Sequence, residues 1–200
     1  MTARLGFPVV MVLVVAACGG SGGNGGGSER APNALAAPNL PGLDSTFEEM
    51  FLPSLETLTR PARQGKTAPK NIPTSGRANY TGYALLDLDH NAVAEATGRM
   101  VLTSDFSSGR VAGRAGEFRR NNEQRVPGEV TFQGKLDRQT GSAVVRAQGN
   151  LEPNGYARTV TGEGHTTFSG SKAQSSYTFV RGQMDNGRRW SMMAAGDRAK

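Results

Sequence analysis

The sequence predicts an all-β fold, an eight-stranded antiparallel up-and-down β-barrel in residues 76–200, and three observations predict it. From Gly76 onward, short runs of alternating apolar and polar residues recur, and each run ends in a turn rich in Gly, Asn, Asp or Ser. The runs number eight, which is enough for antiparallel strands to close on themselves and remove every sheet edge. The turns between them are short. A two-sheet sandwich of the same strands is the alternative.

Residues 1–17 have the pattern of a secretory signal. Arg4 supplies a positive charge, Leu5 to Ala17 form an apolar run, and Ala16 and Ala17 place small side chains before Cys18. Thirteen helical residues rise only about 20 Å, too short for a permanent membrane span. Ordinary secretion with a chance cysteine is the alternative.

The segment from Val14 to Cys18 resembles the lipobox of bacterial lipoproteins. This resemblance implies cleavage before Cys18, acylation of its thiol by membrane lipid, and anchorage to a membrane by several acyl chains (palmitate among them). Gly19 rather than aspartate follows the cysteine, which implies sorting to the outer membrane, with the protein either on the cell surface or facing the periplasm.

Residues 18–42 are expected to be a flexible stalk. Gly19 to Ser28 contain seven glycines in ten residues, and Ala31 to Gly42 add three prolines, so neither stretch buries enough apolar surface to fold. Residues 43–60 are expected to form a short helical segment. Ser45 followed by Glu48 is a capping-box signature, and an apolar stripe follows at helical spacing.

Pro53 predicts that this helical segment consists of one or two short turns. The segment is expected to pack on the barrel, and docking of a partner is the alternative. Residues 61–75, with three prolines and several basic residues, are expected to be a linker.

The barrel strands are expected at residues 77–88, 93–106, 110–118, 127–137, 142–151, 156–168, 175–184 and 188–196. In the run from Val126 to Leu136, alternate residues such as Val130 and Phe132 are apolar, whereas Glu129, Thr131, Gln133 and Lys135 lie in the other phase. One face of each strand is therefore buried and the other is exposed to solvent. Charged residues in the wet phase, Arg114, Glu129, Lys135 and Arg146, favour a barrel that stands in water over one that spans the outer membrane.

The buried phase predicts a packed interior rather than a hollow, lipocalin-like one. Many of its positions hold glycine or alanine, and the larger side chains expected to fill the remaining space are Tyr80, Leu86, Met100, Leu102, Phe106, Phe132, Leu136, Phe168, Trp190 and Met192.

Four motifs in residues 76–200 resemble the β-barrel domain of transferrin-binding protein B and related surface lipoproteins, factor H-binding protein among them. They are Gly76 to Gly82, Leu102 to Gly113, Phe168 to Ala173 and Ala195 to Arg198. Ser169 and Ser171 replace the tyrosine and proline usual in the third motif. The resemblance implies the barrel fold and a surface location. Transferrin as the ligand does not follow from it, because this chain has one barrel and one short N-terminal segment.

The sequence offers little that suggests an enzyme, a metal site or a cofactor. His90 and His165 are the only histidines and are far apart, the single cysteine excludes intrachain disulfides, and no nucleophile motif occurs. The formal charge of +6 is spread along the chain, so nucleic acid is not an expected partner.

The sequence thus predicts a non-enzymatic, lipid-anchored barrel that binds a macromolecule, a host or envelope protein, through loops and its outer face. A small-ligand carrier and a structural envelope lipoprotein are the alternatives. The candidate partner-binding residues lie in two basic clusters beside predicted turns, and they are Arg119, Arg120, Arg125, Arg188 and Arg189.

Overall fold

The computed structural model describes residues 35–40, 42, 45–88 and 94–200. One α-helix, α1 (Phe47–Gln64), precedes eight strands: β1 (Arg77–Asp87), β2 (Ala96–Asp105), β3 (Arg110–Arg120), β4 (Arg125–Asp137), β5 (Ser142–Leu151), β6 (Arg158–Ser169), β7 (Ser175–Met184) and β8 (Arg189–Arg198). Short 3-10 helices lie at η1 (Pro69–Asn71) and η2 (Pro153–Gly155). Cys18 and His90 lie outside the described residues.

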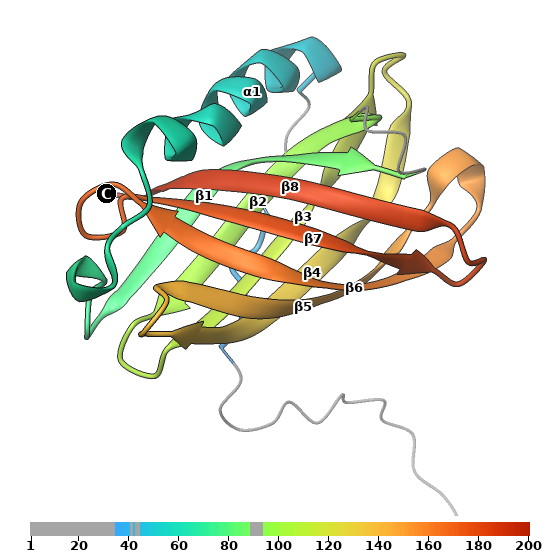
Figure 1. Cartoon of the computed structure of the whole chain (residues 1–200). Helices are drawn as coiled ribbons and strands as arrows, with labels where there is room; N and C mark the ends of the chain where they lie inside the picture. The colour runs from blue at the N-terminus through green and yellow to red at the C-terminus, as the bar shows by residue number, and fades with distance from the viewer. Residues whose placement is uncertain (1–34, 41, 43–44, 89–93) are drawn as a thin grey trace, which may run out of the picture. The chain divides into compact units, whose positions relative to one another are not determined.

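The eight strands form a closed antiparallel barrel in which every strand pairs with its sequence neighbours and β1 pairs with β8. Strands β1 and β8 lie side by side (Figure 1), and their register runs from Tyr80 opposite Arg198 to Asp87 opposite Ser191. The up-and-down barrel expected from the alternating runs is confirmed, and the two-sheet sandwich is excluded.

The barrel interior is filled by side chains. All ten large residues expected to point inward are buried, none more than 5% exposed. The rings of Phe106 and Tyr80 each lie within 6 Å of the ring of Phe168, and the Tyr80 hydroxyl donates a hydrogen bond of 2.8 Å to the Ala173 carbonyl. The packed interior follows from this arrangement.

Small residues allow the barrel wall to close tightly. Gly162 on β6 lies opposite Gly182 on β7, and a Cβ atom on Gly182 would lie 1.8 Å from the Thr161 carbonyl oxygen. Glycine is required at this position because any side chain would collide with the backbone of the neighbouring strand.

Helix α1 begins one residue later than the sequence suggested. The N-cap is Thr46, whose hydroxyl accepts a hydrogen bond from the Glu49 N–H while the Glu49 carboxylate accepts one from the Thr46 N–H. Ser45 and Glu48 offer the same spacing. The Phe47 N–H also donates to Glu123 in the β3–β4 connection, which stabilises the later start.

The helix also continues where short turns were expected. It runs without a break through Pro53 and Pro61 for 18 residues and ends at Gln64, four residues beyond the end of the expected segment 43–60. The physical reason is tertiary. Met50, Ser54 and Thr57 are buried on one face of the helix, and packing against β1, β2 and β8 offsets the hydrogen bond that Pro53 removes.

The helix covers part of the outer barrel wall (Figure 1). Five buried apolar residues do not belong to the interior cluster, and they come from α1 and from the strands β1, β2, β3 and β8: Met50, Leu85, Val101, Ala112 and Ala195. The barrel therefore has a second, outer apolar layer beside its filled interior.

The segment expected to be a linker lies against the barrel. Lys66 forms a β-bridge with Ser169, the Thr67 N–H donates to the Phe168 carbonyl at 2.8 Å, and Ile72 is 4% exposed. Pro61 lies within α1 and Pro69 begins η1, so the prolines of this segment do not detach it from the barrel. Among the described residues, no helix is both long and apolar enough to cross a membrane.

Candidate functional site

The up-and-down topology gathers alternate connections at opposite ends of the barrel. End I comprises residues 87–88, 94–97, 117–128, 150–159 and 183–190, which flank the connections β1–β2, β3–β4, β5–β6 and β7–β8. End II comprises residues 63–77, 105–110, 135–142, 169–175 and 197–200. All five candidate arginines, from clusters nearly 70 residues apart, lie at end I.

Two of the candidate arginines are largely buried and engaged within the protein. The side chains of Arg119 and Arg120 are each 17% exposed. Arg119 lies 3.9 Å from Glu123, which also accepts the Phe47 N–H at the start of α1. Arg120 lies 3.6 Å from Glu95 and donates a hydrogen bond of 2.8 Å to Asn154. These two arginines fix loop positions more than they offer charge to solvent.

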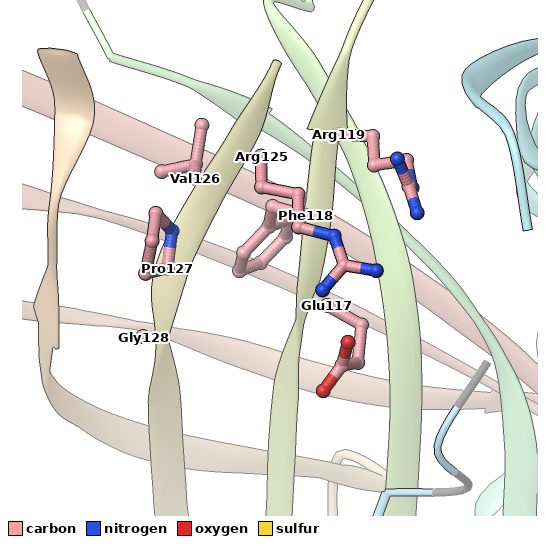
Figure 2. A pocket seen from close by; sticks show the side chains of 7 residues that line it. All are labelled: Glu117, Phe118, Arg119, Arg125, Val126, Pro127 and Gly128. Carbon is pink, nitrogen blue, oxygen red and sulfur yellow. The ribbon is translucent and has the colours of Figure 1, made fainter. Parts of the chain in front are cut away.

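The other three candidate arginines, Arg125, Arg188 and Arg189, are exposed. In Figure 2 the guanidinium of Arg125 extends toward the Glu117 carboxylate, whereas the Arg119 side chain points away from Pro127. These exposed side chains are the ones positioned to touch another molecule.

A surface pocket of about 260 Å³ lies where β3 and β4 change register (Figure 2). A β-bulge between Gly116 and Phe118 leaves Glu117 with a φ of 56°, a left-handed conformation that is uncommon outside glycine. The bulge re-aims Glu117 beside Arg125 at the rim of this pocket.

A second, polar cavity of about 90 Å³ opens at the mouth of end I, above the buried side chains of Leu88 and Met184. Arg120, Arg158 and Arg188 line it, and Arg158 lies 3.7 Å from Asp185. This volume accommodates one side chain or a small anion, not a drug-sized ligand.

The formal charge of end I is balanced among the described residues. Six arginines meet six carboxylates, which come from all four connections and the adjoining strand ends: Asp87, Glu95, Glu117, Glu123, Glu152 and Asp185. The arginine clusters therefore do not make end I strongly basic, and specific contacts rather than long-range attraction are what it offers a partner.

The outer wall carries a row of three apolar side chains and His165 that the sequence analysis did not single out. Val144 lies opposite His165, His165 opposite Phe179, and Phe179 opposite Met193. Val144 is 58% exposed and Met193 is 38% exposed. The signal in the sequence was the presence of apolar residues in the wet phase of β5, β7 and β8.

This apolar row continues toward the helix. Met193 pairs with Leu85, which is 5% exposed, and Leu55 of α1 is 39% exposed. Through the pair of Met193 and Leu85, the row reaches the buried outer apolar layer.

Neither histidine supplies evidence of chemistry. His165 is exposed on β6, and His90 is outside the described residues. In the part of the chain that the structure describes, no group of three His, Cys, Asp or Glu residues is arranged to hold a metal ion.

No family model and no curated protein matches the sequence. Among solved structures, the chain is similar to transferrin-binding protein B of Haemophilus parasuis Hp5, a vaccine antigen. For a single-mutant form of that protein the identity is 22% and the TM-score 0.46, over 68% of this chain and 29% of that chain. For a double-mutant form the identity is 22% and the TM-score 0.43, over 68% and 28%.

The intact Ap-TbpB with its N and C lobes is 16% identical with a TM-score of 0.43, over 66% of this chain and 28% of that chain. This chain thus covers under a third of the length of each of these proteins. The likeness concerns the barrel fold. The matching structures come from the family that the sequence motifs resemble, and the closed eight-stranded barrel itself is confirmed by its strand order.

Proposed function

We propose that this chain is a lipid-anchored protein of the bacterial outer membrane, tethered through acylated Cys18, that binds a protein partner through the loops of end I and the outer wall of the barrel. The partner is a host or envelope protein. The outer-wall row of Val144, His165, Phe179 and Met193 supports the binding surface, because Val144 and Met193 are exposed, Phe179 is half-buried between His165 and Met193, and clustered apolar side chains on a surface mark interaction sites.

The anchor rests on the sequence from Val14 to Cys18. Several acyl chains hold a protein on a membrane essentially permanently, whereas one chain binds only marginally. A Cys18→Ala variant, expressed in the parent cell and fractionated, is expected to leave the membrane fraction and to lose incorporation of labelled palmitate. Membrane association equal to that of the parent would remove the anchor from the proposal.

The filled interior supports binding on the outside. Small-ligand sites enclose several hundred cubic ångströms, but the inward positions here carry Trp190, Phe132 and other fully buried side chains. A carrier function would need these side chains to move. The loops and outer wall need no such rearrangement.

The binding test is affinity capture from outer-membrane extract and from host serum. The bait is the chain from residue 18 onward, compared with a variant carrying Arg125→Ser, Arg188→Ser and Arg189→Ser, and with a second carrying Val144→Ser and Met193→Ser. A matched control removes three positive charges from end II, away from Val144, through Lys70→Ser, Lys172→Ser and Lys200→Ser.

Loss of the same captured protein with either test variant, but not with the control, is the expected result. Equal capture by all four baits would remove end I and the outer wall as the binding surface. Capture of nothing by the parent would favour the structural alternative.

A further inference from the structure

End II carries the positive charge of the protein. Among the described residues it holds ten basic side chains against three carboxylates, Asp105, Asp137 and Asp197, a formal excess of seven positive charges. All ten basic residues are exposed: Arg63, Lys66, Lys70, Arg77, Arg110, Lys135, Arg138, Lys172, Arg198 and Lys200. Because end I is balanced, the net charge of the chain is concentrated at one end of the barrel.

The three carboxylates at end II are already bound within the protein. Asp105 accepts hydrogen bonds from the Ser107 and Ser108 N–H groups and lies 3.4 Å from Arg77. Asp137 accepts from the Gln139 N–H and the Thr140 hydroxyl. Asp197 contacts Arg60 and accepts a hydrogen bond of 2.8 Å from the Ser175 hydroxyl. Turn backbone and side chains thus take up the negative groups, while most of the basic side chains extend into solvent.

The backbone that carries these charges is held in place. The segment of residues 65–76 crosses end II. The β-bridge between Lys66 and Ser169 fixes its first part, and the buried side chain of Ile72 fixes its second part. Arg138 donates to the carbonyls of Phe106 and Pro73, which joins this segment to two turns. The basic side chains are therefore presented from several fixed points around one end.

A groove of about 490 Å³ at end II combines charge with apolar surface. Lys70 and Lys172 line it from different segments, and half-buried Pro73 contributes apolar surface. Ammonium groups beside an apolar lining suit a phosphate that is attached to hydrocarbon.

We propose that end II docks on an anionic membrane surface, with its lysines and arginines on the lipid phosphates. Charges dispersed over several turns match a plane of phosphates, which has no fixed pattern of sites, better than they match one shaped protein epitope. The proposal depends on the lipid anchor of the proposed function in one respect: the anchor keeps the barrel close to the membrane. The chain from Cys18 to Leu35 spans at most about 60 Å when fully extended. An anchored barrel therefore stays within that distance of the bilayer, and even a weak attraction between end II and the lipid phosphates acts at high effective concentration. Docking by end II leaves end I directed away from the bilayer.

The test uses the chain from residue 18 onward with Cys18→Ser, which carries no acyl chain and retains the whole compact unit from Ala34 to Lys200. Co-sedimentation is measured with phosphatidylcholine vesicles with and without about one third phosphatidylglycerol. The end II variant carries Lys70→Ser, Arg110→Ser, Lys135→Ser and Lys172→Ser. The matched control removes four charges elsewhere, through Arg125→Ser, Arg181→Ser, Arg188→Ser and Arg189→Ser.

The parent is expected to bind the anionic vesicles, more weakly as salt rises, and not the neutral ones. Each removed charge lowers partitioning about fivefold, so the end II variant should lose on the order of several hundredfold while the control changes far less. Equal losses in the two variants, or equal binding to both vesicle types, would overturn the proposal. So would binding by end II to an acidic protein but not to vesicles. The lipid-anchor hypothesis is tested separately, by fractionation of cells that express the Cys18→Ala variant.

Discussion

Val130 and Thr131 are neighbours on β4 that face opposite sides of the wall, and placing aspartate at each position tests the whole register of the barrel. Val130 is fully buried in the interior, where it lies between Ala115 on β3 and Gly149 on β5. Thr131 is half-buried on the outer face, and Arg114 is its direct partner across the β3–β4 pair. The two variants therefore introduce the same charge into opposite environments.

The Val130→Asp variant is expected to lose about 1.5–3 kcal/mol of apolar burial. Its buried carboxyl would have a pKa raised by roughly 3–5 units, and because pH 7 lies about 3 units above the ordinary carboxyl pKa, protonating it on folding costs about 4 kcal/mol more at that pH. The total of about 5.5–7 kcal/mol is comparable with the whole stability of a domain, about 5–15 kcal/mol. Thr131→Asp loses one hydrogen bond to the Gln148 carbonyl and gains a neighbour in Arg114, so its net change is within about 1 kcal/mol.

Urea unfolding followed by the fluorescence of Trp190, the only tryptophan and fully buried, measures both changes. The pH dependence supplies a second check. A carboxyl whose pKa is raised on folding costs nothing when it is protonated in both states, so the deficit of Val130→Asp relative to the parent should shrink as the pH falls below the raised pKa. Equal losses in the two variants, or a deficit at position 130 that does not change with pH, would refute the assigned register.

Three further variants test other parts of the fold. Gly164→Ala places a Cβ 1.8 Å from a carbonyl oxygen of β7 and should cost about 1–3 kcal/mol or more in urea unfolding, whereas Gly42→Ala, with open space around it, should cost far less; similar losses would contradict the tight wall. Thr46→Ala removes the helix cap and should lower the unfolding free energy by about 1 kcal/mol, with no loss if the helix starts elsewhere. Hydrogen bonds from Ser108 above all hold the pKa of Asp105 below its usual range, so its stabilisation is present above the ordinary carboxyl pKa and disappears as the pH falls through the lowered value. The deficit of Asp105→Ala should follow that course in unfolding measured across acid pH, and a pH-independent deficit would contradict it.

The barrel strands could be predicted from the sequence because the alternation of apolar and polar residues is a local property. Each run from Val126 to Leu136 or from Ser142 to Leu151 carries its own inward and outward phases, and the turn residues mark where it ends. Closure between β1 and β8 was predicted from the number of runs, and the filled interior from the sizes of the residues in one phase. The anchor at Cys18 is a sequence prediction that the described residues do not reach.

Tertiary structure decided what local pattern left open. Helix α1 continues through Pro53 because its buried face packs on the outer wall, an energy that local helix signals do not contain. Thr46 rather than Ser45 caps the helix, since Glu123 from a distant loop binds the first turn. The distribution of charge over the two ends of the barrel also depends on tertiary structure. The arginines near residues 119 and 188 were visible as local clusters, but carboxylates from other connections balance them, whereas basic residues scattered singly along the sequence converge on end II. Charge acts through space, and only the closed barrel determines which charges are neighbours.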